Sequence, residues 1–171
     1  MKGKFLASAA LALLVLSSCA GGPEEAGEGQ AEGSPGGDLV AVFDFELKGG
    51  GPEYESLRTD APEAVAEALL RGGVLRPVER RQLEKALAEQ ALSLSGVVDE
   101  ATAARAGRVA GARFVLLGSV SFVAGQARVS CRVIDAETAE LVYAQSAYGD
   151  AEYIFDLVDE LAGMVEDEFS E

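Results

Sequence analysis

The side chains that could perform chemistry in this chain are mainly carboxylates. The sequence contains no histidine, which excludes a histidine general base, a Ser-His or Cys-His nucleophile pair and histidine metal ligands. Four carboxylates flank a glycine-rich loop: Glu46, Glu53, Glu55 and Asp60. Paired carboxylates can act as general acid and base, but acids occur throughout this chain and the loop lacks the ligand spacing of a calcium site. We therefore predict that the protein is not an enzyme and has no metal site, no cofactor and no small-molecule substrate.

The remaining candidate nucleophiles are a serine and a cysteine. Gly118-Ser119 lies in an expected strand and the chain has no histidine to activate the serine, so we expect a packing or turn role. Cys131 lies on the apolar side of the alternating segment 126–133, which predicts a small buried core residue and not a reactive thiol.

The N-terminus has the pattern of a secretory signal. Lys2 and Lys4 precede an apolar run over residues 5–16, which is shorter than the about 20 residues that a membrane-spanning helix needs. The run ends in the sequence LSSC at Cys19, which resembles the lipobox of bacterial lipoproteins. This resemblance implies a signal peptide over residues 1–18, lipidation of Cys19 and attachment to a membrane through the N-terminal lipid. An ordinary signal peptide with an incidental cysteine is the alternative.

The segment that follows is predicted to be a tether. By the sorting rules of bacterial lipoproteins, a residue other than Asp after the cysteine, here Ala20, favours the outer membrane with the domain facing the periplasm; the inner membrane is the alternative. Residues 20–37 contain no large apolar side chain, so residues 19–37 are predicted to be disordered. A glycine-rich chain of this length reaches roughly 24 Å on average, which keeps the domain close to its membrane.

Residues 38–171 are predicted to form one α/β domain, a mixed sheet covered by helices. The apolar run 39–45 predicts a buried strand, and Asp60 followed by Pro62 predicts the start of a helix. Later, the alternation over 126–133 predicts a half-exposed antiparallel strand within a three-stranded meander. The complete predicted order of elements is β-α-β-α-α-β-β-β-α.

The charge of the chain restricts its partners. Lys and Arg number 14 and Asp and Glu 29, for a net charge of −15, which excludes a nucleic-acid groove and docking of a basic patch on anionic lipid. Acids concentrate in the last helix, whose polar positions include Asp156, Asp159 and Glu160. A solvated face opposite an apolar stripe explains this pattern; the alternative is an electrostatic contact with a basic partner.

Several segments resemble the curli-assembly (CsgG) family. They are the opening strand 40–45, the sequence VERRQL at 78–83, Gly118-Ser119 and the turn DAET at 135–138. The resemblance covers about residues 39–148, and the superfamily also includes LpoB-type lipoprotein activators of penicillin-binding proteins. None of these relatives is an enzyme. The resemblance implies a binding or assembly module of the cell envelope, an adaptor or activator that contacts an envelope protein or a second copy of itself.

Two more specific functions are implied by the resemblance. Secretion-channel relatives are ring-forming subunits with long membrane-spanning hairpins, whereas the turns expected here at 123–125 and 135–138 are short and leave no room for such hairpins. Activator relatives use a long tether to reach through the peptidoglycan, and the tether expected here is short. A subunit of a curli-type secretion system and an activator of a penicillin-binding protein therefore both stay open as alternatives.

The resemblance also points to one loop. In channel relatives the first loop lines the pore constriction, and the loop here contains Glu53, Tyr54 and Glu55. Tyr54 could play a comparable part, or it could be a tyrosine that simply rests on the loop. We therefore predict two interaction surfaces, the loop 48–59 and the acidic terminal helix.

Overall fold

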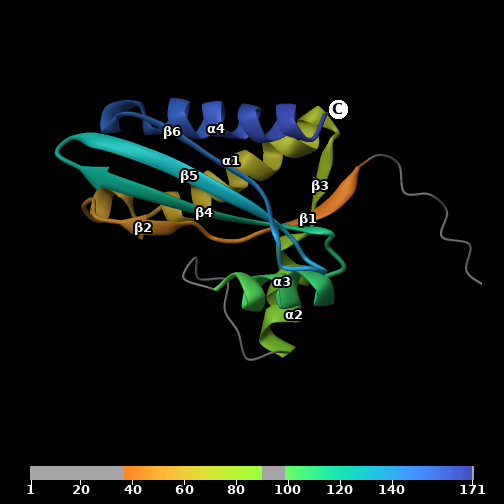
Figure 1. Cartoon of the computed structure of the whole chain (residues 1–171). Coiled ribbons are helices and arrows are strands. Elements are labelled where there is room, and N and C mark those ends of the chain that lie inside the picture. Colours follow the sequence, from red (N-terminus) through yellow and green to blue (C-terminus); the bar gives the residue numbers. More distant parts are fainter. Residues whose placement is uncertain (1–36, 90–98, 171) are drawn as a thin grey trace, which may run out of the picture. The chain divides into compact units, whose positions relative to one another are not determined.

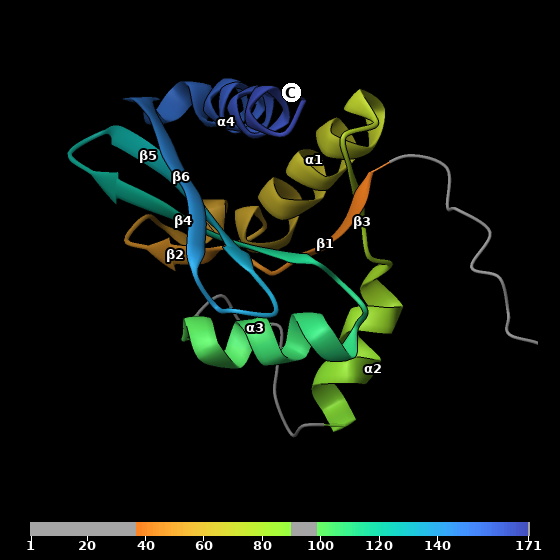
Figure 2. The ribbon, with the colours of Figure 1, turned by 45° about the vertical axis from the view of Figure 1, so that its right-hand side comes forward.

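The computed structural model describes residues 37–89 and 99–170. Within them, a mixed sheet lies between two layers of helices (Figures 1 and 2). Helices α1 (Leu57–Gly72) and α4 (Ile154–Glu168) pack on one face of the sheet, and α2 (Arg80–Glu89) and α3 (Glu100–Val109) pack on part of the other. None of these helices combines the length and the apolar character needed to cross a membrane. The expected signal peptide and Cys19 lie outside the described residues.

The sheet has six strands in the order β3-β1-β4-β5-β6, with β2 also beside β4. They are β1 (Asp38–Val42), β2 (Glu46–Lys48), β3 (Leu75–Pro77), β4 (Phe114–Val123), β5 (Gln126–Asp135) and β6 (Leu141–Asp150). β1 pairs in parallel with β3 and β4, whereas β4, β5 and β6 form the predicted antiparallel meander. The predicted α/β class and element order are confirmed. β2 and two short 3-10 turns, η1 (Pro52–Tyr54) and η2 (Ala151–Tyr153), were not predicted from the sequence.

The predicted opening strand is interrupted by a bulge. Val42 lies opposite Leu116 and Glu46 lies opposite Ser119, so the chain advances four residues while β4 advances three. One extra residue in a strand shifts the following side chains to the other face of the sheet. Phe45 consequently points into the core beneath α1 and α4, where it is fully buried.

Phe45 connects this bulge to both β4 and α1. An added Cβ at Gly118 would lie 2.3 Å from the Phe45 ring, so only glycine fits there. Gly118 therefore allows the Phe45 ring to pack directly against β4. The Phe45 N–H donates to the carbonyl of Arg58 at 3.0 Å. That carbonyl has no helical donor because Pro62, four residues further along α1, lacks an N–H.

The alternation predicted for β5 is confirmed. Ala127, Val129, Cys131 and Val133 are buried beneath α4, and the residues between them point to the opposite face of the sheet. Cys131 is 2% exposed, and burial raises the pKa of its thiol to about 11. It is the small core residue that the sequence predicted.

The two turns of the meander are short, as predicted. Ala124 and Gly125 join β4 to β5 with φ angles of 51° and 81°, the backbone that a two-residue type I′ hairpin turn requires. Residues 136–140 join β5 to β6, and Ala139 there has a φ of 62°. The carboxylate of Asp135 accepts from the N–H groups of Glu137 and Thr138 and holds this second turn.

Candidate functional site

The first predicted surface, the loop 48–59, is largely folded into short elements. β2 ends at Lys48, η1 covers Pro52–Tyr54, and α1 begins at Leu57, three residues before the predicted start at Asp60. The difference arises because the residues just before Asp60 complete a helical turn, in which the N–H of Asp60 donates to the carbonyl of Ser56 at 2.9 Å.

Tyr54 packs against the sheet from this loop. Its half-buried ring stacks on Phe122 of β4, with ring centroids 4.2 Å apart and planes 24° from parallel. Glu53 and Glu55 on either side of it are exposed, and Glu55 forms an ion pair with Arg58 at 3.2 Å. The stacking favours the interpretation in which Tyr54 rests on the domain and holds the loop in place.

The carboxylates Glu46 and Asp60 are not brought together as a pair. Glu46 alternates with Leu47, whose side chain packs toward α1 and α4, so Glu46 faces the other side of the sheet. It forms an ion pair with Lys48 at 2.9 Å. Asp60 is exposed on α1, across the sheet from Glu46. Residues 37–89 and 99–170 also contain no group of three or more His, Cys, Asp or Glu placed to hold a metal ion.

One buried carboxylate was not singled out from the sequence. Asp44 is 9% exposed, and its Oδ1 lies 2.7 Å from Nη2 of Arg80 at the start of α2. Burial opposes the charge of Arg80, but the hydrogen bond to Asp44 and the charges of Asp44, Glu84 and Glu63 outweigh it and raise the pKa of Arg80. The ion pair connects the segment after β1 to α2. Because Arg80 already pairs with Asp44 and Glu84, we assign Arg80 a structural role. An acid inside an otherwise apolar run was the signal that could have revealed it.

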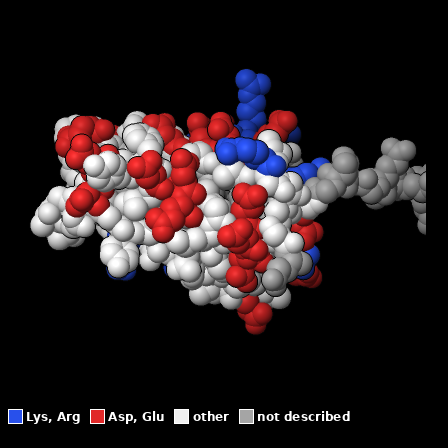
Figure 3. Space-filling model, turned by 90° about the horizontal axis from the view of Figure 1, so that it is seen from above, with Lys and Arg blue, Asp and Glu red and all other residues white. Residues whose placement is uncertain are grey.

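The second predicted surface is the outer face of α4. Asp156, Asp159 and Glu160 are all exposed, and residues 150–171 contain nine acids and no Lys or Arg. Figure 3 shows this side of the molecule, where patches of Asp and Glu far outnumber Lys and Arg. Such a concentration of one sign creates a field that attracts cationic groups.

The three predicted acids of α4 lie on different sides of the helix. Tyr143 of β6 donates to the carbonyl of Met164 at 3.0 Å, which identifies the flank facing β6. Because residues four apart are neighbours on a helix surface, Glu160 lies on the same β6 flank as Met164, whereas Asp156, one further turn back, points away from the buried stripe. Glu166 lies beside Gly72 of α1, with Oε1 2.3 Å from where a Cβ would stand. Asp159, two turns before Glu166, therefore faces the α1 side.

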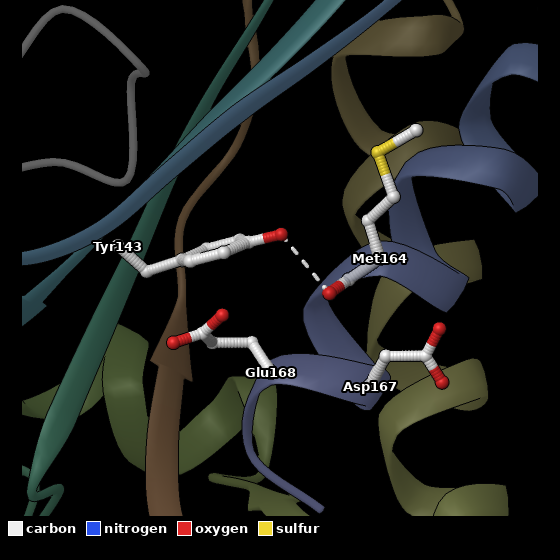
Figure 4. A pocket seen from close by; sticks show the side chains of 4 residues that line it. All are labelled: Tyr143, Met164, Asp167 and Glu168. Atoms are coloured by element: carbon white, nitrogen blue, oxygen red, sulfur yellow. Dashed lines mark hydrogen bonds between the residues drawn. The ribbon is translucent and has the colours of Figure 1, made fainter.

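A hollow of about 360 Å³ lies between β6 and the end of α4 (Figure 4). Tyr143, Met164, Asp167 and Glu168 line it. The Tyr143 hydroxyl points to the Met164 carbonyl, the Glu168 carboxylate lies beside the Tyr143 ring, and the Asp167 carboxylate points away from that ring. Burial, then the neighbouring Cys131, Glu168 and Asp167, raise the pKa of Tyr143. An open hollow with this lining suits a cationic side chain better than an anion.

The opposite face of the sheet is partly open at the β4–β5 turn. A second hollow, of about 280 Å³, lies there between β4, β5 and β6, and includes Val123, Arg128 and Tyr148 in its lining. Val123 is 73% and Tyr148 is 75% exposed. Because Tyr148 lies directly opposite Arg128 across the β5–β6 ladder, this surface combines apolar and cationic groups. Tyr143, near the start of β6, thus borders an acidic hollow on one face, and Tyr148, near its end, borders a mixed apolar and cationic hollow on the other.

The family of the chain is shown by its sequence. The family model described as "Curli production assembly/transport component CsgG" matches residues 25–128. The chain belongs to the CsgG family. The resemblance suggested residues 39–148. The matched range begins earlier than this and also ends earlier, within β5. β6 and α4 of this CsgG-family chain therefore lie beyond the matched range. No curated protein sequence matches the chain.

Solved structures of low sequence identity share the fold. The LpoB C-terminal domain from Salmonella enterica has a TM-score of 0.57 at 21% identity, over 71% of this chain and 88% of its own. The Escherichia coli LpoB C-terminal domain has the same TM-score and identity, over 70% and 87%. Lipoprotein GNA1162 from Neisseria meningitidis has a TM-score of 0.54 at 11% identity, over 78% and 99%. At these identities the likeness establishes the fold of this CsgG-family chain.

Proposed function

We propose that this protein is a lipid-anchored, non-enzymatic protein of the cell envelope that binds another envelope protein as an adaptor or activator. Membership of a family described as a curli assembly and transport component supports an envelope role. The folds of the LpoB C-terminal domain and of lipoprotein GNA1162 are consistent with a lipoprotein domain. The observation that carries a binding function is the acidic surface of α4, where Asp156, Asp159 and Glu160 are exposed together.

The surface is expected to act by attraction of a basic partner. Acids with no interspersed Lys or Arg repel one another and weaken the folded state slightly. A cationic surface close to the nine acids of residues 150–171 would relieve this repulsion. A positively charged patch on an envelope protein would provide such a surface.

In-cell cross-linking tests the proposal. Wild-type protein is cross-linked in intact cells, captured and analysed by mass spectrometry, beside a variant carrying Asp156→Lys, Asp159→Lys and Glu160→Lys. A control variant reverses three exposed acids elsewhere, at Glu89, Glu137 and Glu140. We expect one envelope partner with the wild type and the control, and loss of that partner with the α4 variant. Equal capture by all three proteins would contradict a binding role for α4.

The same experiment separates the more specific functions. A ladder of self-cross-links would support a ring-forming secretion subunit and contradict an adaptor. Capture of a penicillin-binding protein would support the activator function. For the anchor, a Cys19→Ser variant is expected to leave the membrane fraction, and density separation of the two membranes tests the expected outer-membrane location.

A further inference from the structure

β6 forms one outer edge of the sheet, and none of the other described strands pairs with its free side. It is ten residues long, and its only charged residue is the last one, Asp150. It contains no proline. Edge strands normally avoid pairing with other chains by being short or by carrying charged residues or proline. β6 has none of these protections over residues 141–149, so its backbone is available to another strand.

Backbone groups of alternate β6 residues point to this free edge. The N–H of Ser146 donates to Oε1 of Gln145 at 3.1 Å, so it is not used in the ladder with β5. In an antiparallel ladder, residues bonded to the neighbouring strand alternate with residues whose N–H and C=O point away. Ala144 and Tyr148 therefore also present their N–H and C=O groups outward. Of the outward N–H groups of Ala144, Ser146 and Tyr148, the Gln145 side chain accepts only from that of Ser146, and a change of its rotamer would free this donor.

An acidic hollow lies on one face of the sheet beside β6, and an exposed tyrosine of β6 lies on the other face. An added strand would place alternate side chains on the two faces of the sheet. On the α4 face they would meet the hollow of Tyr143, Asp167 and Glu168 (Figure 4). On the other face they would meet exposed Tyr148. Backbone bonds supply affinity and such side-chain sites supply selectivity when a strand is added to a sheet.

The charges beside β6 indicate the composition of the added strand. Glu160 lies on the flank of α4 that faces β6, one turn before Met164, and Asp167 and Glu168 line the hollow next to Tyr143. The side chains that point to α4 should therefore be Lys or Arg. The side chains on the opposite face should be apolar, because Tyr148 is exposed there.

A second copy of the chain fits this edge poorly. Two β6 strands paired antiparallel about a twofold axis would place both α4 helices on the same face of the joined sheet. Since α4 packs against β6 (Figures 1 and 2), the acidic flanks of the two copies would face each other. Like charges opposed across an interface are unfavourable.

We propose that β6 pairs with an extended strand of a partner protein in which basic and apolar residues alternate, the basic side chains meeting the acidic flank of α4. This inference rests on the proposed adaptor function and specifies how its partner is held. The strand would bond to the outward backbone groups of Ala144, Ser146 and Tyr148, with the Gln145 amide displaced.

Binding of designed peptides to the full-length protein in mild detergent tests the inference. The probe is a blocked, fluorescent peptide of alternating Lys and Val, and the controls replace Lys by Glu or Val by Pro. The Lys-Pro peptide keeps the charge but cannot pair as a strand. We expect the Lys-Val peptide to bind and both controls to bind at least about tenfold more weakly.

Two substitutions in β6 locate the binding. Ser146→Pro removes an outward N–H that the native ladder does not use, and edge strands tolerate proline at such positions. We expect it to weaken Lys-Val binding at least about tenfold, whereas Ser146→Ala keeps the N–H and should bind like wild type. Amide exchange on the wild type gives a second measurement: Ala144, Ser146 and Tyr148 should gain protection when the peptide binds.

Several results would overturn the inference. Equal binding of Lys-Val and Lys-Pro peptides, unaffected by Ser146→Pro, would show that α4 merely attracts cations. Protection of the β6 amides at high protein concentration without peptide would identify a second copy as the occupant. The proposed function is judged separately in cells: a partner captured equally by wild type and Ser146→Pro leaves the adaptor function standing and contradicts strand addition. Peptide binding at β6 without a cellular partner contradicts the adaptor function alone.

Discussion

The two ends of the sheet are built differently. β3, at one end, has three residues and includes Arg76 and Pro77, and its neighbours α1 and α2 begin or end within a few residues of it. β6, at the other end, has ten residues and neither Lys, Arg nor Pro. Short edges that carry a charge and a proline resist pairing with other chains. The comparison indicates that one edge is closed by its own sequence, whereas the other is left available.

α4 and β6 also differ from each other although they are adjacent. α4 buries a continuous apolar stripe, Ile154, Leu157, Val158, Leu161 and Val165. β6 leaves Leu141, Val142 and Tyr148 exposed. α4 therefore contributes to the stability of the domain, and the outer side of β6 contributes little. The following experiments test that contrast, from the largest expected effect to the smallest.

The largest effect is expected from a matched pair of leucines. Leu161, on the inner side of α4, is fully buried, whereas Leu141 at the start of β6 is 54% exposed. Leu161→Ala should lower the free energy of unfolding by about 2–5 kcal/mol through the cavity it leaves. Leu141→Ala should change it by less than about 0.5 kcal/mol. Urea unfolding followed by circular dichroism measures both, and equal losses would remove the distinction between α4 and β6.

Proline at neighbouring positions of β6 should have unequal effects. Gln145→Pro removes an N–H that the alternation directs toward β5, and should lower the free energy of unfolding by about 1–3 kcal/mol. Ser146→Pro removes an outward N–H and should cost less than about 1 kcal/mol. Thermal unfolding of the two variants decides this, and a larger loss for Ser146→Pro would show that the outward register is wrong.

Cys131 provides a pH-dependent test one strand inside the edge. Burial raises its pKa to about 11 in the folded state, whereas an unfolded thiol titrates near pH 8.5. The folded state therefore holds the proton more tightly, so this contribution is complete below about pH 8.5 and is lost as the pH rises to about 11. The free energy of unfolding should fall by about 3 kcal/mol over this range. A Cys131→Ala variant is the control for the other titrating groups, and the same fall in that variant would exclude Cys131 as its source.

The smallest effect concerns the acidic flank of α4. Asp156 and Glu160 are four residues apart on the helix, a spacing at which like charges cost about 0.2–0.5 kcal/mol. Glu160→Gln should therefore raise the free energy of unfolding by that amount at low salt, and the gain should vanish in about 1 M salt. Glu137→Gln in the β5–β6 turn should show no comparable gain. If Glu160→Gln destabilises the domain, the acids of α4 stabilise it and need no partner to explain them.

Local patterns in the sequence predicted much of this fold. The alternation of β5, the apolar stripe of α4 and the short turns of the meander each depend on residues close together in the chain, and each is confirmed. The interruption after Val42 was not predicted, because an apolar run alone does not show a bulge. The ion pair of Asp44 with Arg80 joins residues 36 positions apart, and such distant pairs leave no periodic signal.

In the candidate site too, the sequence predicted local features and did not predict contacts between distant residues. Asp156, Asp159 and Glu160 could be identified from the sequence as polar positions of one acidic helix, but not which of them faces β6. The Tyr143–Met164 hydrogen bond and the position of Glu166 beside Gly72 reveal this. The sequence indicated Tyr54 as an aromatic residue on a loop, and only the tertiary structure shows that its ring stacks on Phe122.

By itself, the sequence determined the class of fold, the acidity of the C-terminal helix and the family, because composition and short-range periodicity carry that information. Only the tertiary structure decided that β6 lies at a free edge beside the acidic flank of α4. The order of strands in a sheet is set by long-range pairing and not by the residues of a strand alone. A strand becomes a binding edge only when the rest of the sheet leaves its outward backbone groups without a neighbour.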